Sequence, residues 1–170
     1  MMLERKWITH KVVTGLPTVA KFMVAHTPST LLRISLERWF NLAFRQLITR
    51  GELNFIRKRR ILIEVTDIAL HFSVGLDKNH LKVDVQSQTG DVIVGAELGD
   101  FILLVGGQSD PDTLFFRRRL RITGDTELGL ALKNFLDRVE VNSMLPPLLY
   151  RGLLELTEGL SEQRTTKFPV

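Results

Sequence analysis

The chain has 170 residues, of which 44% are hydrophobic and 25% are charged, and it contains no cysteine. This length suits one compact domain, and the composition is ordinary for a globular protein, which excludes a disordered or fibrous chain. Without cysteine, disulfide frameworks, zinc-thiolate sites, iron-sulfur ligation and thiol nucleophiles are also excluded. No uncharged apolar run approaches the roughly 18 residues that a membrane-spanning helix needs.

The formal net charge of +4 hides an asymmetry along the chain. Residues 1–60 hold twelve Lys and Arg against three Asp and Glu, a net of +9, while residues 61–170 hold eleven against sixteen, a net of −5. Such a basic segment can face an anionic membrane surface or nucleic acid, and it can equally be a solvated helix face. Pro17 and Lys21 interrupt the apolar stretch near the N-terminus, which argues against a signal peptide.

Two helices are expected in the first 50 residues. The first covers about residues 6–24 and is kinked by Pro17. The second has Thr27 as its N-terminal cap and Gly51 as its left-handed C-terminal residue. Apolar residues recur along it every three or four positions, which predicts an amphipathic helix of about five turns.

Four short strands follow. Alternating or β-branched apolar residues predict strands over 61–65, 68–74, 81–85 and 91–96. The turn-forming residues at 77–79 join the second strand to the third, so the first three strands read as an antiparallel meander.

The second half of the chain mixes helices with one further strand. We expect a helix over 98–105, a short helix over 113–117, a strand over 119–123, a helix over 126–141 and a last amphipathic helix over 148–160. Asp110 starts the short helix and Asp125 caps the one that follows the strand. The strand shows one polar and one apolar face, because Arg119 and Arg121 alternate with apolar residues.

The sequence offers little for catalysis. It has no G-x-S-x-G elbow and no phosphate-binding loop, and its four histidines lack metal-ligand spacing. We therefore expect no enzyme activity, no cofactor and no metal site. The basic runs 57–60 and 117–119 suit phosphates of nucleic acid or of lipid headgroups, and the single Tyr argues against a nucleic-acid reader, which usually exposes aromatic residues.

Apolar residues are unusually dense between positions 101 and 135. Phe115 and Phe116 are adjacent, so a short helix presents them in two directions and one core face does not easily take both. This pattern predicts that one of them lines a cavity. The alternative is that all of these residues simply pack the core.

The stretch from Asp110 to Asp137 resembles the sterol-carrier-protein-2-like family, in which a strand, a Gly-Asp pair and an amphipathic helix follow one another. More narrowly, it is similar to bacterial accessory factors of ubiquinone biosynthesis. The resemblance extends less sharply over residues 28–140. It implies an α+β fold with a curved, mostly antiparallel five-stranded sheet, covered by helices and enclosing a hydrophobic tunnel.

The same resemblance implies the function. Members bind sterols, acyl chains or phospholipids without chemistry, and the narrower group assists oxygen-independent ubiquinone synthesis beside proteins that perform the hydroxylations. We expect this chain to hold a prenylated precursor in the cytoplasm, peripheral to the inner membrane and in contact with its surface, with no nucleic-acid partner. A general carrier of acidic phospholipids is the alternative.

Site residues and domains follow as expectations. Apolar residues expected in the tunnel are Phe40, Phe44, Phe101, Leu104, Phe115, Phe116, Leu128, Leu132, Phe135 and Leu136. Arginines expected at its mouth, to meet a headgroup, are Arg57, Arg59, Arg60, Arg117 and Arg118. We expect a basic helical extension over 1–26, the lipid-binding domain over 27–142, and a C-terminal amphipathic helix with a tail over 143–170.

Overall fold

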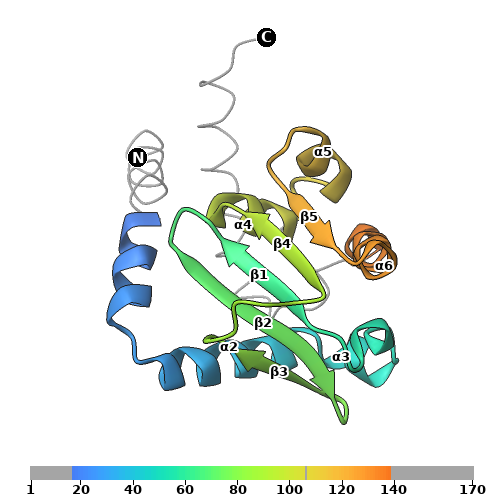
Figure 1. Cartoon of the computed structure of the whole chain (residues 1–170), viewed down its shortest axis with the longest axis horizontal. Coiled ribbons are helices and arrows are strands. Elements are labelled where there is room, and N and C mark those ends of the chain that lie inside the picture. Colours follow the sequence, from blue (N-terminus) through green and yellow to red (C-terminus); the bar gives the residue numbers. More distant parts are fainter. Residues whose placement is uncertain (1–16, 106, 139–170) are drawn as a thin grey trace, which may run out of the picture.

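A computed structural model describes residues 17–105 and 107–138 (Figure 1). Residues 17–26 are helical. The elements after them are the helices α2 Ser29–Ala43 and α3 Arg45–Thr49, the 3₁₀ turn η1 Asn54–Ile56, the strands β1 Ile61–Val65, β2 Leu70–Asp77, β3 His80–Asp84 and β4 Val92–Ala96, the helices α4 Leu98–Val105 and α5 Pro111–Phe116, the strand β5 Arg121–Gly124 and the helix α6 Thr126–Arg138. The expected helix over 148–160 lies outside the described residues.

The five strands form one mixed sheet in the order β3-β2-β1-β4-β5. Only β1 and β4 are parallel, and the three other pairs are antiparallel. This confirms the predicted α+β fold and the antiparallel meander of β1, β2 and β3. The parallel pair requires a crossover from β3 to β4, which passes over one face of the sheet (Figure 1). On that face a Cβ on Gly90 would lie 2.9 Å from the Cβ of Leu62.

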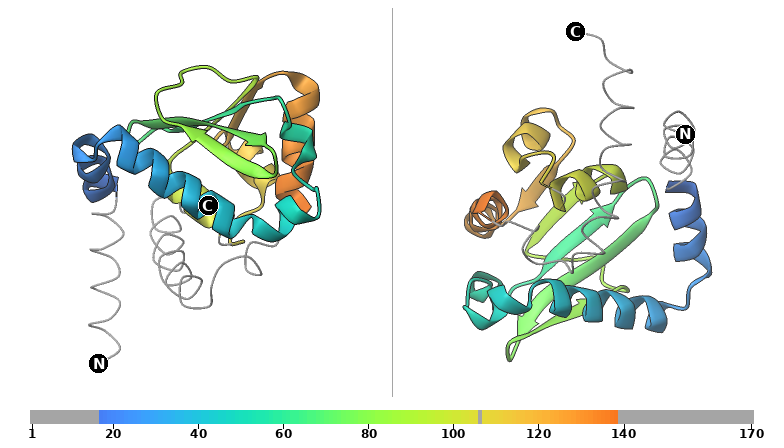
Figure 2. Two further views of the ribbon diagram at one scale, coloured as in Figure 1. Left: turned by 90° about the horizontal axis from the view of Figure 1, so that it is seen from below. Right: turned by 180° about the vertical axis from the view of Figure 1, so that it is seen from behind.

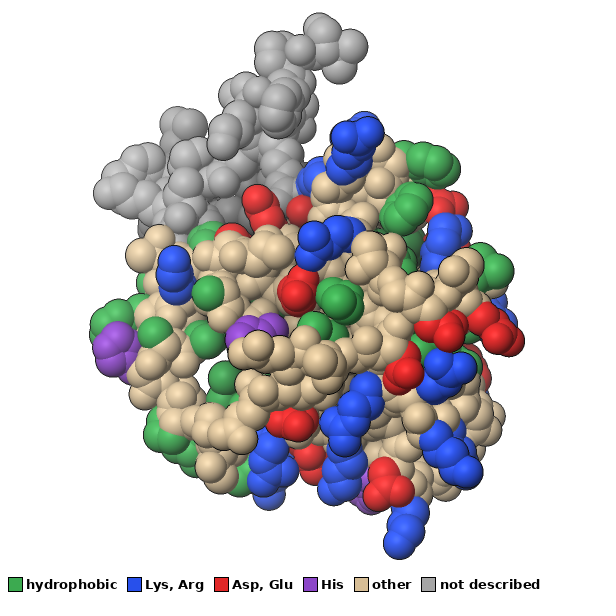
Figure 3. Space-filling view, viewed as in Figure 1, with side chains coloured by type: hydrophobic (Ala, Val, Ile, Leu, Met, Phe, Trp, Pro, Cys, Tyr) green, Lys and Arg blue, Asp and Glu red, His purple; other side chains and the backbone are tan. Residues whose placement is uncertain are grey.

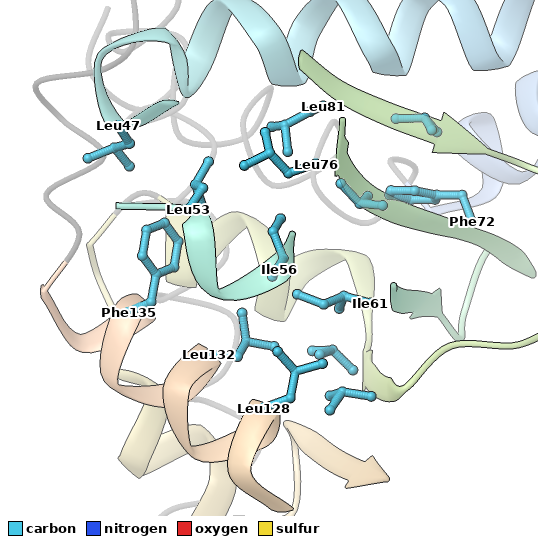
Figure 4. Packing of buried hydrophobic residues seen from close by; sticks show 14 of the residues in the cluster. Leu47, Leu53, Ile56, Ile61, Phe72, Leu76, Leu81, Leu128, Leu132 and Phe135 are labelled. Carbon is cyan, nitrogen blue, oxygen red and sulfur yellow. The ribbon is translucent and has the colours of Figure 1, made fainter. Parts of the chain in front are cut away.

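The helices cover the opposite face. Figure 2 shows α2 and α4 on the same side of the sheet. The strand register brings Ile61 opposite Val74 and Val92 on this side. These residues join buried side chains of α3, η1 and α6 in one hydrophobic cluster, shown in Figure 4. The core therefore lies between the sheet and the helices, as an amphipathic helix on a half-apolar sheet requires.

Side chains of α2 protect the exposed edge of the sheet. The Nδ2 group of Asn41 donates to the carbonyl of Leu81 at 2.8 Å, and its Oδ1 accepts from the Leu81 N–H at 2.9 Å. Glu37 accepts from the N–H of Val83 at 3.2 Å. The helix thus satisfies backbone groups of Leu81 and Val83 in edge strand β3, which limits pairing with another chain.

The long second helix is divided at Phe44, between α2 and α3. This break corrects the prediction of one continuous helix, and it allows Leu47 and Ile48 of α3 to be buried in the core. Thr27 is not the cap of α2, because its hydroxyl donates to the Met23 carbonyl at 2.6 Å and so closes the preceding helix. Gly51 has φ +73°, as the predicted left-handed position requires.

Three elements begin two residues away from their predicted starts. β2 begins at Leu70 because Ile68, which is buried, belongs to the turn after β1. α5 begins at Pro111, directly after its cap Asp110. β5 begins at Arg121, since the chain turns beforehand at Arg118, with φ +58°.

Candidate lipid-binding site

The predicted tunnel residues occupy three environments. Leu128, Leu132 and Phe135 are buried on the inner side of α6, where Figure 4 shows them pointing toward η1 and β1. The partly buried members, which pack around this core, are Phe40, Phe44, Phe101, Leu104 and Leu136. Phe115 and Phe116 lie outside the core, with 43% and 80% of their surface exposed. The first two groups belong to one continuous apolar interior, and the third does not.

Aromatic rings connect α6 to the sheet through α2. The ring of Phe44 lies 6.4 Å from Phe135 and 5.9 Å from Phe40, between ring centroids. Phe40 in turn lies 5.8 Å from Phe72 of β2. Such tilted or offset contacts suit aromatic pairs. The row of rings therefore runs across the space between α6, α2 and the sheet.

Sequence reasoning missed two members of this aromatic group. Phe55, in η1, has its ring centroid 5.4 Å from Phe135. Phe72 occupies the apolar face of β2, opposite Ile63 of β1. The alternation along β2 could have identified Phe72 as an inward residue. The sequence around Phe55 does not indicate whether its side chain points into the core, because a single 3₁₀ turn is too short to show a periodic pattern.

This interior is apolar. Its side chains are aliphatic and aromatic, so the interactions that they can offer a ligand are dispersion and the exclusion of water, which is worth roughly 25 cal/mol per Å² of apolar area. Among the described residues, no three His, Cys, Asp or Glu side chains are grouped to hold a metal ion. Over the same residues, no helix is both long and apolar enough to span a membrane.

The arginines of the first basic run are engaged within the protein. Arg59 contacts Asp125 at 3.1 Å and Asp91 at 3.5 Å, and the hydrogen bond to Asp125 raises the pKa of Arg59. The Nη1 group of Arg60 donates to the hydroxyl of Ser73 at 3.2 Å. Arg57 donates to the side chains of Asn54 and Asn79, each at 3.2 Å.

Arg117 and Arg118 differ from them. Both are exposed, and neither forms an ion pair or side-chain hydrogen bond within residues 17–105 and 107–138. They precede β5, whereas Asp125, the partner of Arg59, follows it. The predicted headgroup arginines are therefore split between the two ends of β5, and the fold does not bring them to one mouth.

The Gly-Asp pair between β5 and α6 has a structural explanation. Gly124 has φ +112°, and a Cβ there would lie 2.3 Å from the carbonyl oxygen of Asp91. The backbone N–H of Asp125 donates to that same oxygen at 2.8 Å. The Asp125 carboxylate accepts from the N–H of Leu128 at 2.9 Å, which caps α6 as predicted. The pKa of Asp125 is lowered mainly by this hydrogen bond and, to a smaller extent, by the hydrogen bond from Arg59.

Comparison with known proteins defines the class. Residues 36–137 match the SCP-2 sterol transfer family, and the chain belongs to that family. The fold agrees with the structure of "UbiJ-SCP2 Ubiquinone synthesis protein", which has a TM-score of 0.52 and 15% identity over 64% of this chain and 95% of that one.

Curated relatives narrow the comparison. The chain is 39% identical to "Ubiquinone biosynthesis accessory factor UbiT" of Escherichia coli strain K12, over 84% of this chain and 80% of that protein. The UbiT protein of Escherichia coli O157:H7 matches with the same identity and coverage. These similarities confirm the predicted family and the predicted class, a non-catalytic member of a lipid-carrier family.

Proposed function

We propose that this protein is a lipid-binding accessory factor of ubiquinone biosynthesis. The cargo is a prenylated precursor, held with its tail among the side chains between α2, α6 and the sheet. The observation that supports this most directly is the row of rings from Phe135 through Phe44 to Phe72, in a chain 39% identical to UbiT. The protein presents the precursor to other ubiquinone-biosynthesis proteins, which carry out the chemistry.

The partly buried rings are the part of the interior suited to a ligand. Phe40 and Phe44 lie at the border of the core and retain some solvent exposure, while Leu128 and Leu132 are fully packed. A prenyl tail that lies along the partly buried rings gains apolar contact without displacing the packed core. Phe101 and Leu104 of α4 border the same cluster and would extend this surface.

Mass spectrometry of organic extracts from protein purified without detergent tests the proposal. A prenylated phenol or quinone recovered in a fixed ratio to protein supports it. Phe44→Trp adds volume at the border of the core and should lower the lipid content several-fold, because the larger ring occupies ligand space. Phe22→Trp is the matched control, since Phe22 is 63% exposed on helix 17–26, and its lipid content should stay unchanged.

A general phospholipid carrier is the second candidate. It is favoured by the exposed cations Arg117 and Arg118, since a guanidinium binds a phosphodiester well. The same extracts separate the two candidates, because recovery of phosphatidyl species alone indicates the second. If neither kind of lipid is recovered and fluorescent lipid analogues do not bind, both functions are wrong.

A further inference from the structure

The end of α5 exposes two aromatic rings beside two cations. We call this surface the α5 tip, formed by Phe115, Phe116, Arg117 and Arg118. The two rings meet edge to face with centroids 6.0 Å apart, and Phe116 is 80% exposed. Figure 3 shows hydrophobic and basic side chains together over this part of the molecule. Contact between exposed aromatic rings and water is unfavourable, and neighbouring exposed apolar side chains often mark a binding surface.

The α5 tip is held in place from both sides. Leu114 and Leu120 are 0% and 1% exposed and anchor the segment in the core. Between them, Arg118 adopts φ +58°, and its N–H donates to the Phe115 carbonyl at 2.9 Å. Arg119 forms an ion pair with Asp100 of α4. The rings end α5 and the cations begin the turn that follows it, so the two buried leucines hold both on one exposed segment.

We infer that the α5 tip is the membrane-docking surface of the protein, and that its partner is an anionic phospholipid bilayer. Phe115 and Phe116 enter the headgroup region, where aromatic rings are favoured, and Arg117 and Arg118 bind lipid phosphates. Charge complementarity supports this partner, because these two arginines have no acidic partner within the described residues. The inference goes beyond the proposed function, which concerns cargo held in the interior.

The charged residues around the tip mark its limits. Arg119, the next residue, is neutralised by Asp100, and Arg121 pairs with Glu64 at 2.7 Å. Asp112, at the start of α5, pairs with Lys133 of α6 at 2.7 Å. These three pairs are neutralised within the protein, while Asp110, at the other end of α5, is bonded to Thr113. Next to the rings, Arg117 and Arg118 are cations without a carboxylate partner among residues 17–105 and 107–138.

Vesicle flotation of the full chain tests the inference. The probes are vesicles of phosphatidylcholine containing phosphatidylglycerol, and vesicles of phosphatidylcholine alone. The protein should bind the anionic vesicles and bind the neutral ones much more weakly. Arg117→Gln combined with Arg118→Gln should lower partition onto anionic vesicles about tenfold or more, since each basic residue near the surface contributes separately. Phe116→Ser should lower it on both kinds of vesicle.

Two controls match the two kinds of variant. Arg38→Gln combined with Arg45→Gln removes the same charge from exposed arginines of the α2 and α3 region. Leu130→Ser removes an apolar side chain that is 58% exposed on α6. Both should leave partition nearly unchanged. Losses equal to those of the tip variants would overturn the inference, because binding would then depend on overall charge or on another surface.

Lipid content measured on the same variants separates this inference from the proposed function. Phe115→Asp should abolish vesicle binding and retain the co-purifying lipid, since Phe115 lies outside the core. If it loses the lipid and still binds vesicles, Phe115 belongs to the interior site and the tip is not the docking surface. Failure of Phe44→Trp to lower lipid content would count against the interior site alone.

Discussion

The two basic runs of this chain look alike in sequence and differ in structure. The run at 57–60 uses its arginines internally: Arg59 joins the start of β4 to the start of α6 through Asp91 and Asp125. Among the described residues, the run at 117–119 pairs Arg119 alone with a carboxylate and leaves Arg117 and Arg118 exposed. A cluster of arginines therefore indicates a binding surface only where the fold places no carboxylates beside it.

The two regions also differ in how the backbone is fixed. At the Arg59 end, two chain segments approach closely at Gly124 and Asp91. At the α5 tip, one short segment folds on itself between two buried leucines. We expect substitutions at the first end to affect stability and substitutions at the exposed residues of the second to affect binding.

Gly124→Ala should give the largest effect. A Cβ at this position would meet the Asp91 carbonyl oxygen at 2.3 Å, and φ +112° is strained for any L side chain. We expect the free energy of unfolding to fall by about 3 kcal/mol or more. Urea denaturation followed by circular dichroism measures it. Gly107→Ala is the control for φ alone, because Gly107 has φ +67° and nothing within 4 Å of its Cβ position. Equal losses in both variants would show that close packing at Asp91 is unimportant.

Arg119→Met should rank second, and it tests whether the arginine that directly follows the α5 tip is structural. Asp100 is 2% exposed, and burial raises its pKa while Arg119 acts in the opposite direction. Removing the guanidinium should cost about 2 to 3 kcal/mol, less than the roughly 3 to 5 kcal/mol of a fully buried ion pair, because Arg119 is partly exposed. Denaturation in urea measures this loss of stability. Arg119→Lys should lose less stability, because a lysine keeps the positive charge. An unchanged urea midpoint in Arg119→Met would show that Arg119 is not structural.

Local sequence patterns predicted much of the fold. Alternation identified the strands, and Asp110 and Asp125 marked helix starts because an aspartate before a helix satisfies its first N–H groups. The parallel pairing of β1 with β4 was not predicted. It depends on a crossover that no local pattern encodes. The break at Phe44 was likewise missed, since the 3.6-residue periodicity continues through it and only tertiary packing of α3 requires it.

The candidate site was predicted less completely. Leu128, Leu132 and Phe135 were expected inside because they repeat along one helix face, and the structure buries them. The arrangement of the arginines could not be predicted, because Arg59 and Asp125 are 66 positions apart in the chain. For the same reason, sequence could not show that Arg119 is paired with Asp100.

Asp125→Ala should have an intermediate effect at the Arg59 end. The variant loses the cap of α6 and one carboxylate partner of Arg59. We expect about a fivefold fall in the folding equilibrium constant, the usual cost of removing an aspartate cap. Asp112→Ala is the matched control, because its pair with Lys133 is a surface ion pair worth little. If the two variants are equally stable, the capping interaction does not contribute.

The contribution of the Asp125 charge should depend on pH. Its pKa is lowered in the folded protein from an ordinary value of 3.8, so the ionised form is favoured by folding. The stabilisation is present above the unfolded pKa and is lost as pH falls through the folded one. Asp125→Asn should therefore be less stable than the unmodified chain at pH 7, and the gap should close below about pH 4. A gap that persists at pH 2 would assign the effect to shape rather than charge.

Arg117→Gln combined with Arg118→Gln should have the smallest effect on stability. Neither side chain makes an ion pair or side-chain hydrogen bond within the described residues, so the free energy of unfolding should change by less than about 0.5 kcal/mol. The urea midpoint and the vesicle partition of this double variant should be measured on the same preparation. An unchanged midpoint with a large loss of partition assigns these arginines to binding. A midpoint lowered as far as that of Asp125→Ala would show that both basic runs are structural, because the charges of Arg117 and Arg118 would then be used within the fold.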